Sequence, residues 1–226
     1  KASVDKMTPQ DVRKQLQDIY SRLISTNLSV RQFYPKEHSL IGGGVGIGSL
    51  PLGSISLRDV SYEAIYTEIE TNDSYHIKFP DGGLLIFQYI FGGEGGLEKH
   101  RLCYFPSPAL PSVDEAPHLY ENDELYGDII QKKLTRFPIR FDYEPANHKD
   151  IDHPASHLTL GQYENCRIPV DGAVSPNAFV MFLLRNFYSR SYRKNKNKLD
   201  KRPCHIPAMS TLTNAERRIS HFINGR

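Results

Sequence analysis

The sequence predicts an α+β protein in which an antiparallel meander sheet carries an N-terminal helix and C-terminal helices packed on it. Three observations lead to this fold class. Apolar residues recur at helical spacing within residues 1–40, alternate through much of residues 60–170, and return to helical spacing over residues 175–226. A chain of 226 residues suits one large domain, so we expect residues 1–226 to form a single α+β domain.

The first helix has a clear start signal at Thr8-Pro9. Thr8 is a favoured N-cap residue, and proline is favoured at the first helical position. Apolar residues then follow at helical spacing, at Val12, Leu16, Ile19, Tyr20 and Leu23. This pattern predicts an amphipathic helix that ends near Ser25 and buries its apolar face.

The segment Ile41–Pro51 contains five glycines in the run G-G-G-V-G-I-G. It lacks the Lys-Ser/Thr ending of a P-loop and the flanking strand and helix of a nucleotide-binding turn. We therefore expect a loop here and regard phosphate binding by this segment as the weaker alternative.

A period of two begins near Tyr62 and continues to Phe105, which predicts four antiparallel strands. Ile65, Thr67 and Ile69 alternate with polar residues, and the apolar run Leu84–Phe91 is typical of a central strand. Turn signals separate the strands at residues 72–73, 80–83 and 92–96. The first hairpin would set Glu68 and Glu70 near His76 and Lys78.

Shorter elements are expected after the meander. They are a loop at Pro106–Glu124, a helix at Leu125–Leu134, strands at Ile139–Tyr143, His157–Gly161 and Cys166–Val170, a helix capped by Ser175, and a last helix opened by the capping box Thr213-Asn214-Ala215-Glu216.

Three widely spaced cysteines, Cys103, Cys166 and Cys204, argue against a disulfide framework and against a cysteine-rich zinc site. They indicate a reducing, cytoplasmic location. No run approaches the ~20 apolar residues of a membrane-spanning helix, and no apolar signal segment follows residues 1–7. We therefore expect no association with a membrane.

The segment Arg140–Arg167 concentrates groups that could carry phosphodiester chemistry. Its candidate catalytic residues are Asp142, Glu144, His148, His153 and His157. The two carboxylates of Asp142 and Glu144 share one face of a predicted strand and could hold a divalent cation, Mg²⁺ or Mn²⁺. Histidine exchanges protons near neutral pH, and Arg101, Arg140 or Arg167 could stabilise negative charge on a phosphate. Alternatively, the strand face is simply solvated and the histidines bond to backbone carbonyls.

A basic strip runs from Arg185 to Arg202, with eight basic residues and one acid in a chain whose total net charge is only +2. Its aromatic and basic side chains are typical of single-stranded nucleic-acid binding. The candidate nucleic-acid-binding residues are Arg185, Arg190, Tyr192, Arg193, Lys194 and Lys196 of the strip, together with Arg140 and Arg167 outside it. Five neutralised phosphates would give a log–log salt slope of roughly −3.5 to −4.5. The alternative is a solvated helix end whose cations suit the helix dipole.

Four stretches resemble an uncharacterised bacterial protein family: H-R-L-C-Y-F-P-S-P, R-F-D-Y-E-P, H-P-A-S-H-L-T-L-G-Q-Y-E-N-C-R-I-P-V and S-P-N-A-F-V-M-F-L-L-R-N-F-Y. The resemblance covers about Lys99 to Tyr188 and implies no particular activity. The order of strands and the H…HP…H segment is also similar to a small toxin family of toxin–antitoxin pairs, which implies action on nucleic acid.

Three functional hypotheses follow. The first is a nucleic-acid-directed effector, a nuclease-like enzyme of a bacterial defence or toxin system, either metal-dependent or histidine-assisted. The second is a non-catalytic subunit that binds nucleic acid or a partner protein of such a system within a larger complex. The third is an antitoxin-like regulatory subunit that binds its partner through the acidic remainder of the chain. Metal dependence separates the first hypothesis from the others, and salt sensitivity separates the second from the third.

Overall fold

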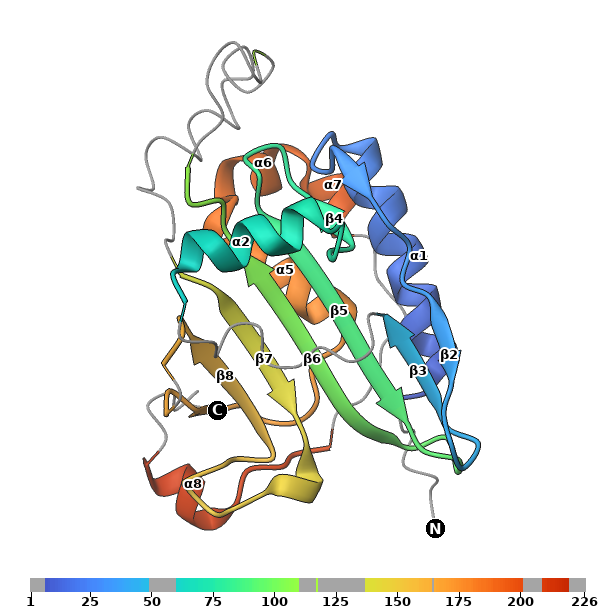
Figure 1. Ribbon diagram of the computed structural model, residues 1–226, viewed down its shortest axis with the longest axis vertical. Coiled ribbons are helices and arrows are strands. Elements are labelled where there is room, and N and C mark those ends of the chain that lie inside the picture. The colour runs from blue at the N-terminus through green and yellow to red at the C-terminus, as the bar shows by residue number, and fades with distance from the viewer. Residues whose placement is uncertain are drawn as a thin grey trace.

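The structure, a computed structural model, describes residues 7–48, 60–109, 117, 137–163, 165–200 and 209–219. Within these residues nine strands form one antiparallel sheet, and helices cover both of its faces (Figure 1). The strands are β1 (Arg31–Gln32), β2 (Glu37–Ser39), β3 (Val45–Gly48), β4 (Ile77–Lys78), β5 (Leu84–Phe91), β6 (Leu97–Phe105), β7 (Ile139–Tyr143), β8 (Ser156–Leu160) and β9 (Ile168–Pro169). The helices are α1 (Pro9–Ser25), α2 (Tyr62–Thr71), the 3-10 turn η2 (Pro145–Asn147), α5 (Pro176–Phe187), α6 (Ser189–Lys194), α7 (Lys196–Leu199) and α8 (Asn214–Ile219).

The sheet has the order β1-β4-β5-β6-β7-β8-β9. The long strand β5 pairs with β4 through its first two residues and with β3 through its last four, and β2 pairs with β3. The strands β4 to β9 pair in chain order, so the α+β fold and its antiparallel sheet are confirmed. Within residues 62–105, where four strands were expected, the structure has three: β4, β5 and β6.

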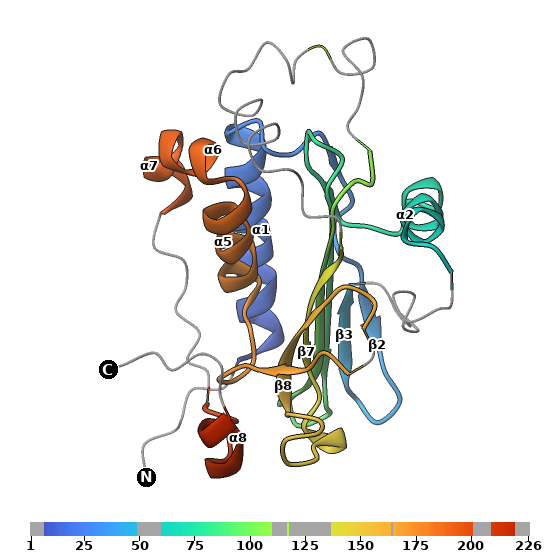
Figure 2. The same cartoon turned by 90° about the vertical axis from the view of Figure 1, so that its left-hand side faces the viewer.

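The two faces of the sheet differ in what covers them. Figure 2 shows α1 and α5 side by side on one face and α2 alone on the other. Alternate residues of β5, such as Phe87 and Tyr89, join the larger core beneath α1 and α5. Their neighbours Leu84 and Ile86 pack in a smaller cluster with Ile65 and Ile69 of α2.

The predicted helix starts are confirmed. The Asp11 amide donates to the Thr8 hydroxyl at 3.2 Å, and the Thr8 amide donates to the Asp11 carboxylate at 3.1 Å, which completes a capping box at α1. Ser175 caps α5 by accepting from the Ala178 amide at 3.2 Å. Such caps satisfy amides that have no partner inside the helix.

The strand predicted around residues 65–69 is wrong, because residues 62–71 form the helix α2. Ser61 caps it by accepting from the Ala64 amide at 3.2 Å. Ile65, Tyr66 and Ile69 are all buried, a spacing of one and four residues that fits one side of a helix and not one face of a strand. Lys78 still pairs with Glu70, at 2.6 Å, but across a helix–strand contact instead of a hairpin.

The glycine-rich segment, expected to be a loop, supplies the strand β3, and residues 31–32 and 37–39 of the predicted helical N-terminal region also join the sheet. Gly48 has a φ of +102°, and a Cβ there would lie 1.9 Å from the carbonyl oxygen of Phe87. The absence of a side chain at Gly48 therefore lets β3 approach β5 closely, which gives this glycine a structural role.

The capping box at the last helix is confirmed, since Thr213 and Glu216 exchange bonds of 2.9 and 3.1 Å. The helix expected at Leu125–Leu134, most of the loop Pro106–Glu124, Cys204 and the strip residues Lys201 and Arg202 lie outside the described residues. None of the described helices combines the length and the apolar character needed to cross a membrane.

Candidate functional site

Antiparallel register places four polar side chains in one row across the face of the sheet that carries α2. Gln88 of β5 lies opposite Arg101 of β6, Arg101 opposite Asp142 of β7, and Asp142 opposite His157 of β8. We call these four residues the polar row. Gln88, Asp142 and His157 are buried, each at most 5% exposed, and Arg101 is partly buried.

Asp142 is held by two arginines. Its carboxylate accepts from the Nε atom of Arg101 at 2.7 Å and from the Nε atom of Arg140 at 2.5 Å. Burial alone would raise the pKa of Asp142, but the charges of Arg140 and Arg101 outweigh burial and hold that pKa below its ordinary value. Asp142 is therefore ionised, and each of its carboxylate oxygens already accepts a hydrogen bond from an arginine.

His157 is held as a neutral imidazole. Burial lowers its pKa, and the nearby charge of Asp142 only partly opposes this effect. Its Nδ1 lies 2.9 Å from the Pro154 carbonyl oxygen, which assigns the proton to Nδ1. Its Nε2 lies 3.7 Å from Asp142 Oδ2, too far for a hydrogen bond. The expectation of a histidine bonded to a backbone carbonyl is met here.

Glu144, expected on the strand face of Asp142, follows the last residue of β7 and pairs with Lys99 at 2.8 Å. Each carboxylate of the expected metal pair thus already has a basic partner. This arrangement favours two ion pairs over a shared cation at Asp142 and Glu144, because a metal would have to displace those partners.

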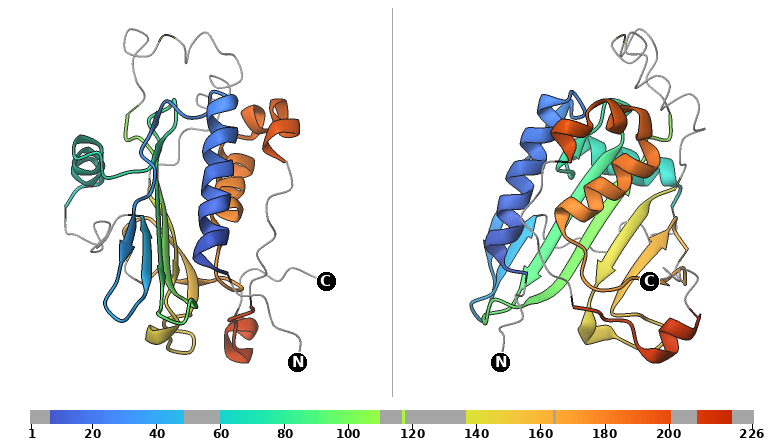
Figure 3. Two further views of the ribbon diagram at one scale, coloured as in Figure 1. Left: turned by 90° about the vertical axis from the view of Figure 1, so that its right-hand side faces the viewer. Right: turned by 180° about the vertical axis from the view of Figure 1, so that it is seen from behind.

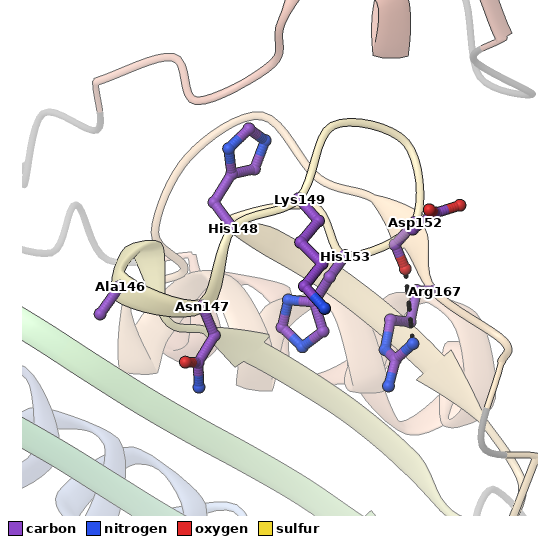
Figure 4. Close-up of a pocket in the computed structure, with 7 residues that line it drawn as sticks. All are labelled: Ala146, Asn147, His148, Lys149, Asp152, His153 and Arg167. Atoms are coloured by element: carbon purple, nitrogen blue, oxygen red, sulfur yellow. Dashed lines mark hydrogen bonds between the residues drawn. The ribbon is translucent and has the colours of Figure 1, made fainter.

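A solvent-open pocket of about 500 Å³ lies beyond the end of β7 (Figure 4). We call it the turn pocket; its lining residues are Ala146, Asn147, His148, Lys149, Asp152, His153 and Arg167. The structure therefore brings three candidates, His148, His153 and Arg167, to one place. The rings of His153 and His157 lie 5.0 Å apart in an edge-to-face contact, which joins the pocket to the polar row.

The turn itself is tightly closed. Lys149 and His153 exchange two backbone hydrogen bonds, at 3.0 and 2.8 Å. Between them Ile151 adopts a φ of +71°, a left-handed conformation that is unusual for a β-branched residue. Such strain costs about 1–3 kcal/mol and is found most often at functional sites.

The side chains of the turn point to opposite sides. In Figure 4 the imidazole of His148 points away from the side chains of Asn147, Lys149 and His153. On its own side His148 Nε2 lies 3.2 Å from Oε1 of Glu216 in α8. Asp150 accepts a hydrogen bond from the hydroxyl of Thr213. One potential ligand atom from each of His148, Asp150 and Glu216 lies within 4.8 Å of the other two, so these residues could hold a metal ion.

The basic strip is partly committed to internal contacts. The hydroxyl of Tyr192 donates to the Asp200 carboxylate at 2.7 Å, and Arg185 contacts both the Tyr192 ring and Asp200. Arg190, Arg193, Lys194 and Lys196 remain at the surface. Figure 3 shows α6 and α7 at one end of the molecule and α8 at the other, so the strip and the turn pocket do not adjoin.

The candidate residues of the sequence analysis leave out five polar residues of the turn pocket and of the cluster beside it: Asn147, Lys149, Asp150, Asp152 and Glu216. Lys149 lies within the segment that drew attention, and its position between His148 and Asp150 was the available signal. Glu216 was recognised only as part of a capping box. Its contact with His148 spans 68 residues, and no local pattern encodes it.

Comparison with known proteins gives a family. The profile described as "Uncharacterized conserved protein (DUF2290)" matches residues 28–224, which extends the resemblance seen over Lys99–Tyr188 to most of the chain. No curated protein and no solved structure matches, and nothing supports the similarity to a toxin family. The chain therefore belongs to the DUF2290 family of uncharacterised conserved proteins.

Proposed function

We propose that the protein acts on nucleic acid and that the turn pocket binds a phosphate group and supports cleavage of the phosphodiester bond. The observation that carries this proposal is the gathering of nitrogen donors in one open pocket. Asn147, Lys149 and Arg167 supply an amide, an ammonium and a guanidinium, and Asp152 is the one acid among the lining residues. Such a donor set suits a phosphate oxygen.

His153 is the group best placed to move a proton in this pocket. Its Nδ1 is shielded from solvent and has no hydrogen-bond partner in the described residues, so Nε2 is the ring nitrogen available to a ligand. Cleavage requires a group that takes a proton from the attacking oxygen and one that returns a proton to the leaving oxygen, and imidazole can serve either step. Arg167 and Lys149 would stabilise the charge that develops on the phosphate.

His157 of the polar row would hold the ring of His153 in place. The ring of His157 packs against that of His153, and its own Nδ1 is fixed by the Pro154 carbonyl. We therefore assign His157 as a positioning residue, because its side chain is only 4% exposed and does not line the pocket.

The test is to incubate the protein with labelled single- and double-stranded RNA and DNA, with Mg²⁺, Mn²⁺ or EDTA, and to read both retention on a filter and cleavage on a gel. The double variant Lys149→Ala/Arg167→Ala should weaken retention and reduce the log–log salt slope by about 1.4 for single strands. The matched control is Lys14→Ala/Lys36→Ala, which removes two exposed cations elsewhere and should leave the slope unchanged.

His153→Gln should abolish cleavage while retention persists. Equal retention and cleavage by the Lys149/Arg167 variant and its control would contradict the proposal, as would an active His153→Gln protein.

A second candidate function is nucleic-acid binding without cleavage, through the exposed cations of the basic strip. Four of them, Arg190, Arg193, Lys194 and Lys196, lie within seven residues on the surface of α6 and α7. Because the strip and the turn pocket lie at opposite ends, the two functions can be tested by separate variants. Salt-sensitive retention that is lost only in the strip variant, without cleavage, would favour this second function.

A further inference from the structure

We propose that His148, Asp150 and Glu216 bind one divalent transition-metal ion, which joins α8 to the turn that follows β7. The proposal goes beyond the proposed function, because the ion can be measured without any nucleic acid. It also replaces Asp142 and Glu144 as the candidate metal ligands.

The geometry is close to that of a metal site. Ligand atoms that bind an ion at about 2.0–2.2 Å lie roughly 3–4 Å from one another. The candidate atoms of the three side chains already lie within 4.8 Å of one another. Rotations of the three side chains that shorten these separations by roughly 1 Å would bring them to ligand distance.

The charge balance also points to a cation. Glu216 is only 1% exposed, and in the described residues neither Glu216 nor Asp150 forms an ion pair with lysine or arginine. Asp142, the other strongly buried carboxylate near this site, is held by two arginines. Two neighbouring carboxylates, one of them buried, are stabilised when a positive charge lies between them.

The ligand types indicate which ion fits. One imidazole nitrogen and two carboxylates suit Zn²⁺ or Mn²⁺, whereas Mg²⁺ and Ca²⁺ prefer oxygen ligands alone. Because His148 also lines the turn pocket, a metal bound here would lie at the border of that pocket.

A structural consequence follows for α8. This helix has only six residues, and its Glu216 is 66 to 68 residues distant from its partners in the turn. Helices this short are marginal unless tertiary contacts hold them. The ion would link α8, through one bond to Glu216, to the turn that follows β7, through one bond each to His148 and Asp150.

The experiment uses the full chain, stripped of metal with EDTA and dialysed. Zn²⁺ is titrated by calorimetry, and bound zinc is counted by mass spectrometry. We expect one Zn²⁺ per chain, weaker binding of Mg²⁺ by at least tenfold, and slower hydrogen exchange of the amides in residues 209–219 when Zn²⁺ is present.

Asp150→Asn and His148→Gln change side chains that are partly exposed, so the fold should persist; each should weaken Zn²⁺ binding at least tenfold. The matched control is Asp152→Asn, which neutralises an exposed carboxylate of the same turn outside the cluster and should bind Zn²⁺ as the unmodified chain does. Absent Zn²⁺ binding, or binding unchanged in both ligand variants, would overturn the proposal. Neither result depends on whether the turn pocket binds nucleic acid.

Discussion

The polar row and the turn pocket both take side chains from residues 139–167, but the two regions use their charges in opposite ways. In the polar row the charges of Arg101 and Asp142 meet each other inside the protein, together with that of Arg140. In the turn pocket Lys149 and Arg167 lie around open space and form no ion pair within the described residues.

This difference separates structure from candidate chemistry. A dense group of charged residues attracts attention in a sequence whether or not its charges neutralise each other. Asp142 is buried and paired with Arg101 and Arg140, which indicates a structural role. Lys149 and His153 line an open pocket, which makes them candidates for ligand contact. Four measurements test these assignments.

The largest expected effect is on stability, at Asp142. Replacing Asp142 with Ala removes the carboxylate that the Nε atoms of both Arg101 and Arg140 bind, and should lower the free energy of unfolding by about 3–5 kcal/mol. Asp152→Ala, at the pocket, should change it by less than about 0.5 kcal/mol. Urea unfolding at pH 7 measures both. Similar losses in the two variants would contradict the structural role assigned to Asp142.

The pH dependence of stability should be steep, because of two buried histidines. Burial lowers the pKa of His76 and of His100 to about 4. His76 Nδ1 accepts a hydrogen bond from the Phe87 amide at 3.0 Å, and His100 Nε2 accepts one from the Val174 amide at 2.8 Å. Both hydrogen bonds require a neutral ring, because a protonated ring nitrogen cannot accept.

The sign follows from proton uptake on unfolding. Above pH 6.5 both histidines are neutral in the folded and unfolded chain, and their contribution is fully present. As the pH falls from about 6.5 towards 4, only the unfolded chain gains these protons, so stability falls by up to about 1.4 kcal/mol per pH unit for each histidine. Urea unfolding from pH 7 to pH 5 measures this slope. A His100→Gln variant whose slope equals that of the unmodified chain would contradict the assignment.

A smaller effect is expected at the strained turn. Ile151→Gly should leave stability unchanged or raise it by up to about 1 kcal/mol, because glycine adopts a positive φ without the clash of a Cβ. Ile24→Gly is the matched control, since Ile24 is similarly exposed, 50% against 48%, but lies in α1. There glycine should cost about 0.5–1 kcal/mol. Thermal unfolding compares the two, and an equal cost would show that Ile151 is not strained.

The smallest effect on stability per substituted residue should come from the basic strip. The triple variant Arg193→Ala/Lys194→Ala/Lys196→Ala removes exposed cations and should shift the free energy of unfolding by no more than about 0.5 kcal/mol per residue. If the strip contacts single-stranded nucleic acid, the same variant should reduce the log–log salt slope by about 2. An unchanged slope would remove the strip from the binding surface.

The helix starts and the central meander could be read from the sequence alone. Thr8, Ser175 and Thr213 each bond to groups three residues away, so the signal and its partner lie in one short window. The apolar run Leu84–Phe91 likewise identified the central strand, because a strand buried on both faces needs apolar residues on both.

Other features were decided by tertiary structure. The positions of Ile65 and Ile69 fit both a strand and a helix, and the burial of Tyr66 against the sheet selects the helix. Gly48 becomes part of a strand because β5 offers an edge close enough for pairing.

The candidate site shows the same division. The sequence by itself determined which chemical groups are abundant in residues 140–167, and that histidines, carboxylates and arginines occur there together. Only the tertiary structure decided that Arg101 neutralises Asp142, that His153 and Arg167 share a pocket, and that Glu216 lies beside His148. The physical reason is that charge balance and burial depend on spatial neighbours. Strand register brings Arg101 to Asp142, 41 positions along the chain, and the return of the C-terminal segment brings Glu216 to His148, 68 positions along the chain.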